Sequence, residues 1–263
     1  MFNIFEYDFM QRAFIAGALI AIILPCIGQL VLIKRLSMIG DTLSHSSLAG
    51  LSIGLCFGIS PILSAMIFCV FAAFSIEVIR NKLKNYQEVS TVIILAASIG
   101  IAGIMADLSA SANAICSYLF GSIVTISDQE FYLLIALSLC FLVIYFTYYN
   151  DFYLLLFDPT SAKILGLRVK FLNFTISFLT AIAVAISAKT IGSLIVSSLL
   201  VIPSIMAIEI CKSYKKSLIL SIIFSLIFVF LGLFLSYIFN LRPGSVIVLI
   251  AVLSLILVLL IKK

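Results

Sequence analysis

The chain has 263 residues, of which 64% are hydrophobic and only 10% are charged. A soluble domain has about 45–50% apolar and about 25% charged residues, so this composition excludes an ordinary soluble fold and predicts a membrane protein. At about 20 apolar residues per crossing, the length allows roughly eight to ten spanning helices and no further soluble domain of about 100 residues. We therefore expect one all-α, polytopic membrane domain over residues 1–263.

No phosphate-binding loop of the form G-x-x-x-x-G-K-[ST] occurs in the sequence. The chain is therefore not expected to be an enzyme, and any ATP hydrolysis must be carried by another polypeptide. The six cysteines are scattered through the chain without a C-x-x-C motif, which predicts neither a disulfide framework nor a permanently bound metal.

Charged residues and clusters of Gly, Pro, Asn and Asp divide the apolar sequence into nine candidate spans, although eight crossings also fit the length. The expected spans are residues 9–33, 37–57, 62–79, 91–107, 131–149, 171–188, 191–210, 217–239 and 245–261. With nine crossings, the two ends of the chain lie on opposite sides of the membrane.

Lysine and arginine are divided unevenly between the two sides that these spans define. Thirteen of the 16 cations fall on one side, and only Arg12, Lys189 and Arg242 fall on the other. The positive-inside rule makes the cation-rich side cytoplasmic, which places the N-terminus outside and the C-terminus in the cytoplasm. The net charge of +5 is thus explained by topology and contact with membrane lipid, and no nucleic-acid partner is expected.

Two connections are longer than a turn. On the outer side, residues 116–124 are apolar but too few to span, which predicts a short helix that lies at the membrane interface or dips into the protein. On the cytoplasmic side, Asp158 as N-cap, Pro159 at the first helical position and Gly166 as terminator predict a helix of one to two turns. Ala162 lies within this helix. These features alone leave open whether it is a solvated loop helix or a docking element for a cytoplasmic partner.

Asp41 and His45 form the only deep ionisable pair expected in a span. A helix that begins near Ser37 places Asp41 about 6 Å and His45 about 12 Å along its axis, within a hydrocarbon layer about 30 Å thick. Their spacing of four residues puts both side chains on one face, and Ser44 adds a hydroxyl in the same turn. A lone histidine is more often a satisfied core residue, but an aspartate one turn away favours a functional site.

A carboxylate together with an imidazole suits a divalent cation such as Zn²⁺ or Mn²⁺. One chain supplies two such ligands, and a two-fold homodimer with this helix at its axis would supply four. Ser46, Gly50, Gly54 and Gly58 form a stripe of small residues on the same span. Such a stripe is typical of ordinary helix packing, and it would also permit the close approach that the dimer needs.

Five segments in a shared order connect the chain to a known family: residues 9–13, 34–50, 118–122, 192–203 and 243–245. Together they resemble the integral-membrane permease subunit of bacterial ATP-binding-cassette importers for zinc and manganese. The segment from Gly40 to Gly50 is the most specific of them, and the resemblance covers nearly the whole chain.

The resemblance implies a permease in the bacterial cytoplasmic (inner) membrane. Its expected partners are two cytoplasmic ATP-binding subunits, an extracytoplasmic metal-binding protein and a second permease copy, most simply in a homodimer. It also implies that Asp41 and His45 form a transient translocation site, and that the helix from Asp158 to Gly166 is the coupling helix that seats in the ATPase.

The resemblance further implies that the segment with Ser197 and Ser198 lines the pathway, with Ser44 as another candidate. On their own, Ser197 and Ser198 would be packed hydroxyls before a proline kink. Ser46 and Ala49 stand where manganese and iron relatives often carry alanine and proline, which favours Zn²⁺ over Mn²⁺ or Fe²⁺ as the transported ion.

Two other functions remain open from the residues. A proton-coupled secondary metal transporter would use Asp41 and His45 as a proton relay, and a membrane assembly subunit would transport nothing. An intramembrane aspartyl protease is not expected, because Met38 stands where the motif G-x-G-D requires glycine.

Overall fold

The computed structural model describes residues 8–83, 86–108, 128–239 and 241–261, and all the regular elements in these ranges are helices. They are α1 (Asp8–Ile33), α2 (Ile39–Phe57), α3 (Pro61–Lys82), α4 (Val89–Leu108), α6 (Asp128–Thr147), α7 (Tyr149–Phe157), α8 (Pro159–Ile164), α9 (Val169–Thr190), α10 (Ser193–Ile210), α11 (Tyr214–Phe239) and α12 (Pro243–Ile261). Each of the nine predicted spans coincides with one helix, and the ends agree to within three residues. The predicted all-α fold is confirmed.

Seven of the helices are long and apolar enough to cross a membrane, namely α1, α3, α4, α6, α9, α11 and α12. A shorter apolar helix covers Ile195–Ile210 within α10. The protein is therefore a multi-pass membrane protein. The predicted crossing by α2 does not meet the same criteria, because its sequence carries an aspartate, a histidine and several hydroxyl side chains.

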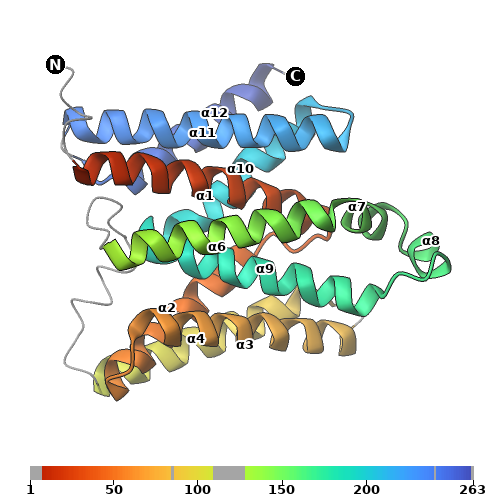
Figure 1. Ribbon diagram of the computed structural model, residues 1–263, viewed down its shortest axis with the longest axis horizontal. Helices are drawn as coiled ribbons and strands as arrows, with labels where there is room; N and C mark the ends of the chain where they lie inside the picture. Colours follow the sequence, from red (N-terminus) through yellow and green to blue (C-terminus); the bar gives the residue numbers. More distant parts are fainter. Residues whose placement is uncertain (1–7, 84–85, 109–127, 240, 262–263) are drawn as a thin grey trace.

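The helices form two groups that share α9 (Figure 1). Helices α2, α3 and α4 pack together on one side, and α1, α10, α11 and α12 pack together on the other. Helix α9 contacts members of both groups, and α6 lies against α1 and α9. The polar helix α2 contacts α3, α4, α9 and α10. Its buried hydroxyl side chains therefore face other helices and are not exposed to lipid.

The stripe of small residues on α2 is used for packing within the chain. A Cβ atom at Gly50 would lie 2.6 Å from the carbonyl oxygen of Ser64 on α3. The hydroxyls of Ser46 and Ser98 are 2.7 Å apart and join α2 to α4. The ordinary packing interpretation is therefore confirmed for Ser46, Gly50 and Gly54, which α3 and α4 cover, whereas nothing lies within 4 Å of a Cβ atom added at Gly58. The dimer itself stays a prediction.

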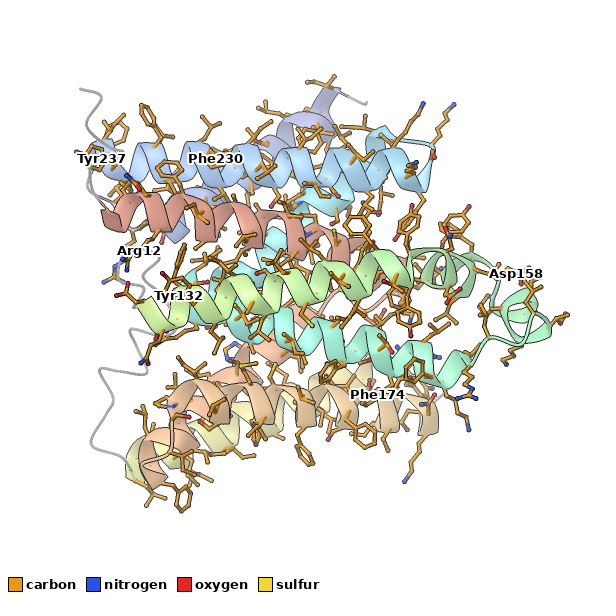
Figure 2. All side chains as sticks on the ribbon, viewed as in Figure 1. Arg12, Tyr132, Asp158, Phe174, Phe230 and Tyr237 are labelled. Atoms are coloured by element: carbon orange, nitrogen blue, oxygen red, sulfur yellow. The ribbon has the colours of Figure 1, made fainter. Side chains whose placement is uncertain are left out.

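Ion pairs gather at the end of the bundle where α1 begins. Arg12 of α1 pairs with Asp128, and Lys189 Nζ of α9 lies 3.4 Å from Glu130 Oε1, so the first turn of α6 is tied to both neighbours. Figure 2 shows Arg12 and Asp158 at opposite ends of the molecule, as predicted for an outer and a cytoplasmic residue.

The predicted cytoplasmic connection contains one helix more than expected. Helix α7 follows α6 almost directly and buries Phe152 and Leu155. The spacing of its buried apolar residues, three apart, indicated a helix. It was missed because no glycine or proline in the sequence separates it from α6. The predicted interfacial helix at 116–124 lies outside the described residues.

Candidate functional site

The chain reaches α2 through a tight turn at the end of α1. The N–H of Leu36 donates to the carbonyl of Val31 at 2.9 Å, and Arg35 adopts a positive φ of 55°. This is a Schellman turn, and Arg35 occupies the left-handed position that glycine usually fills. Asp41 then falls in the first turn of α2, where the positive end of the helix dipole favours a carboxylate.

Asp41 and His45 lie side by side on α2. His45 Nε2 is 3.7 Å from Asp41 Oδ1, and the side chains are 21% and 33% exposed respectively. This separation exceeds a hydrogen bond but is short enough for one ion to sit about 2.1 Å from both donor atoms, the usual zinc–ligand distance. Across the described ranges, no cluster of three or more His, Cys, Asp or Glu side chains is placed to hold a metal. Within these ranges the pair therefore offers a metal ion two donor groups.

Helix α10 brings one of the predicted pathway serines to the start of α2. A Cβ atom at Gly40 would lie 3.4 Å from Ser197 Cα, so the two helices meet one residue before Asp41. Ser197 and Ser198 are half-buried on α10. Ser44 differs, because it is fully buried and its hydroxyl has no hydrogen-bond partner in the described part of the chain.

Helix α8 has the predicted start. Asp158 is the N-cap, and its Oδ1 accepts hydrogen bonds from the N–H groups of Thr160 at 3.1 Å and Ser161 at 3.0 Å. Pro159 occupies the first helical position. Hydrogen bonds from Ser161 hold the pKa of the Asp158 carboxyl below its usual value. The cap therefore stays ionised at neutral pH and is lost only as the pH falls through that lowered pKa.

The end of α8 is also as predicted. Leu167 N–H donates to the Ala162 carbonyl at 3.0 Å, and Gly166 has a φ of 80° in a second Schellman turn. Ala162 is fully buried, whereas Ile164 and Leu165 are 81% and 70% exposed. Figure 1 shows α8 projecting at one end of the bundle. A capped helix with exposed apolar side chains beyond the spans is suited to contact another protein.

A multi-pass helical bundle that encloses a polar helix with an open carboxylate–imidazole pair has the architecture of a membrane permease. The chain belongs to the ABC 3 transport family, whose sequence model matches residues 6–262. The predicted resemblance is thus confirmed at the level of the family.

Three similar proteins illustrate the relationship. A "Probable metal transport system membrane protein" of Treponema pallidum is 33% identical over 96% of this chain and 95% of that protein. The "Manganese transport system membrane protein MntC" of Listeria monocytogenes is 26% identical over 95% of this chain and 89% of that protein. The fold matches the structure of PsaBC from Streptococcus pneumoniae in complex with Fab, with a TM-score of 0.86, 23% identity and coverage of 97% and 92%.

Sequence reasoning missed two features near the site. Gly40 was part of the matching motif, but its role as the contact point for Ser197 becomes visible only in the fold. Lys34 was used for topology and as the first residue of a matching segment, and Asn173 was not singled out, although the Lys34 ammonium donates a hydrogen bond to the Asn173 side chain. No sequence spacing connects residues so far apart in the chain.

Proposed function

We propose that the chain is the permease subunit of an ATP-driven importer for a divalent transition metal, with Asp41 and His45 as its transient translocation site. The observation that carries the proposal is the 3.7 Å separation of one carboxylate and one imidazole on the enclosed helix α2. The names of the relatives, a metal and a manganese transport system, support a metal as the cargo.

An open pair suits transit better than a closed four-ligand site would. Conduction requires a site that attracts the ion but releases it again, and two protein ligands leave the remaining positions to water or to other groups. Ser197, beside the first turn of α2, and Ser198 are proposed to line the path. Ser44 on α2 supplies a hydroxyl that has no hydrogen-bond partner among the described residues.

The energy is proposed to come from separate subunits. Two cytoplasmic ATP-binding subunits bind α8, an extracytoplasmic metal-binding protein delivers the ion, and a second permease copy completes the complex as a homodimer. This chain itself hydrolyses no ATP in the proposal. The exposed apolar residues Ile164 and Leu165 form part of the surface that the ATPase would cover.

Zinc is the proposed ion, with Mn²⁺ as the alternative. Ser46 and Ala49 after the histidine favour zinc, whereas a relative named for manganese favours the other ion. One nitrogen ligand and one oxygen ligand suit Zn²⁺ and Mn²⁺ alike, so the donor atoms do not distinguish the two ions. Competition decides the question: excess unlabelled Zn²⁺, but not Mn²⁺, should block uptake of radioactive zinc if the proposal holds.

Reconstitution tests the proposed function. The permease is placed in liposomes with candidate ATPase subunits and a candidate metal-binding protein from the same organism, and uptake of radioactive metal is measured. We expect uptake only when ATP is supplied to the ATPase. Uptake driven by a proton gradient without any ATPase would establish the secondary transporter instead, and no uptake under either condition would favour an assembly subunit.

Asp158→Ala is expected to weaken ATPase binding several-fold, because it removes the acceptor that holds the first turn of α8. Co-purification of the ATPase with the tagged permease measures the effect. Asp158→Asn is the matched control, since an amide oxygen still accepts from the two N–H groups. Equal co-purification of the ATPase with the alanine variant and the native chain would show that α8 is not the docking element.

A further inference from the structure

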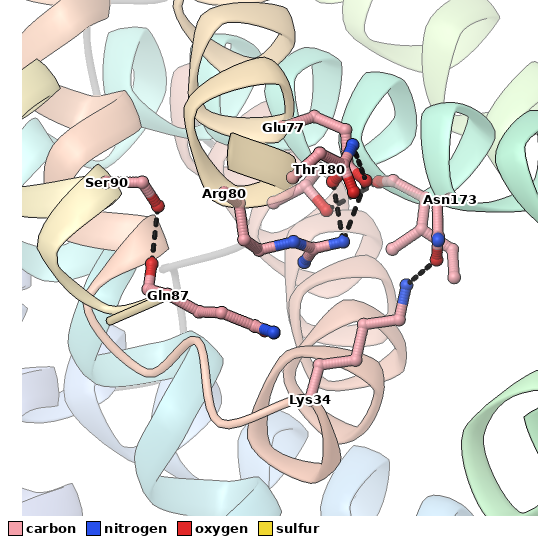
Figure 3. A network of polar contacts seen from close by, with 9 residues as sticks. Lys34, Glu77, Arg80, Gln87, Ser90, Asn173 and Thr180 are labelled. Carbon is pink, nitrogen blue, oxygen red and sulfur yellow. Dashed lines mark hydrogen bonds and ion pairs between the residues drawn. The ribbon is translucent and has the colours of Figure 1, made fainter. Parts of the chain in front are cut away.

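A cluster of polar side chains lies where α1, α3 and α9 meet, and none of them belongs to the proposed metal site (Figure 3). Its members, called here the Lys34 cluster, are Lys34, Glu77, Arg80, Asn81 and Asn173. Lys34 Nζ donates to Asn173 Oδ1 at 2.6 Å. Arg80 Nη2 lies 2.7 Å from Glu77 Oε2, with both side chains 11% exposed.

Within this cluster, Lys34 donates its hydrogen bond to an uncharged acceptor, the side-chain oxygen of Asn173. Glu77 is already engaged by Arg80 and by Asn81 Nδ2, which lies 3.4 Å away. Burial and, to a lesser extent, the nearby Arg80 lower the pKa of Lys34 to about 7, although Glu77 opposes both effects. A lysine in such surroundings is held in place by the side-chain amide of Asn173.

The two partners belong to the segments that adjoin α8 and α2, respectively. Asn173 is in the second turn of α9, which follows α8 after the turn at Gly166. Lys34 is the residue directly after α1, at the start of the turn that leads into α2. Both turns are closed by backbone hydrogen bonds.

We propose that the hydrogen bond from Lys34 to Asn173 is the positioning contact through which a displacement of α8 reaches α2 and its Asp41–His45 pair. The proposal rests on the proposed function, since it assumes that the ATPase moves α8. In this proposal α9 moves together with α8, and Asn173 pulls Lys34 through their hydrogen bond. The hydrogen-bonded turn at Arg35 then shifts the start of α2. The bond adds a polar link at the end of α1 to the direct packing of α9 against α2, and its loss should weaken the transmission of the movement.

The test compares ATP hydrolysis with metal uptake in the reconstituted complex. Asn173→Ala and Lys34→Met should each lower the metal imported per ATP hydrolysed about tenfold, as expected at the upper end for an ordinary side-chain hydrogen bond. The double variant should be no worse than either single variant, because both remove the same contact. Asn173→Asp should retain coupling, because a carboxylate also accepts from Lys34.

Lys170→Met is the matched control, because Lys170 is an exposed cation in the first turn of α9. It should leave the ratio of uptake to hydrolysis unchanged. An unchanged ratio in Asn173→Ala, an equal fall of both rates, or additive losses in the double variant would overturn the proposed contact. Failure of ATP-driven uptake by the native chain would instead overturn the proposed function, and the two failures are therefore distinguishable.

Discussion

His45→Ala and Asp41→Ala are each expected to abolish metal uptake while the permease still assembles with its ATPase. Each variant leaves the ion with one protein ligand on α2 where two now lie 3.7 Å apart. Changes to groups that merely orient a metal ligand cost about 10–100-fold in affinity or activity, so loss of a ligand should cost at least as much. Uptake of radioactive metal into liposomes measures the loss, and co-purification of the ATPase measures assembly.

The control for these variants must separate a transport defect from a folding defect. Ser52 lies on the same helix, and within the described residues its hydroxyl donates only to the carbonyl of Leu48 one turn earlier, so Ser52→Ala should retain uptake. Asp41→Asn and His45→Gln keep the shape of the side chains and should fail like the alanine variants. Normal uptake by any of these four site variants would show that the pair is not the translocation site.

The features that sequence predicted well are those that local chemistry determines. Lipid forces each span to satisfy its own backbone hydrogen bonds, so apolar runs become helices. Capping is equally local, and Asp158, Pro159 and Gly166 placed both ends of α8 correctly. The spacing of four residues likewise brought Asp41 beside His45.

The features that sequence did not predict depend on how helices pack. The small residues of α2 were recognised, but a stripe such as that at Gly50 does not reveal whether a second copy or α3 covers it. The bond between Lys34 and Asn173 exists because α9 packs beside α1. Helix α7 was missed for a local reason, since no breaker separates Tyr149 from the end of α6.

Gly28→Ala is expected to destabilise the protein strongly. A Cβ atom there would overlap the carbonyl oxygen of Leu200 and lie 3.0 Å from its carbonyl carbon, so α1 and α10 must separate. Overpacking costs about 1–3 kcal/mol, and a clash with backbone falls at the upper end because no side chain can turn away. The hydroxyl of Ser204, which donates to the Pro25 carbonyl at 3.3 Å, would lose that contact as well.

Thermal unfolding in detergent measures this effect, which should lower Tm by roughly 6–12 °C for about 3 kcal/mol in a chain of this size. Gly100→Ala and Gly103→Ala are matched controls, because nothing lies within 4 Å of either added Cβ on α4. Alanine there should leave Tm unchanged or raise it, since glycine costs up to about 1 kcal/mol in a helix. If Gly28→Ala has the same Tm as these controls, α1 and α10 do not pack through Gly28. Helix α10 also places Ser197 beside Gly40. The separation of α1 from α10 should therefore reduce uptake in Gly28→Ala but not in the two controls.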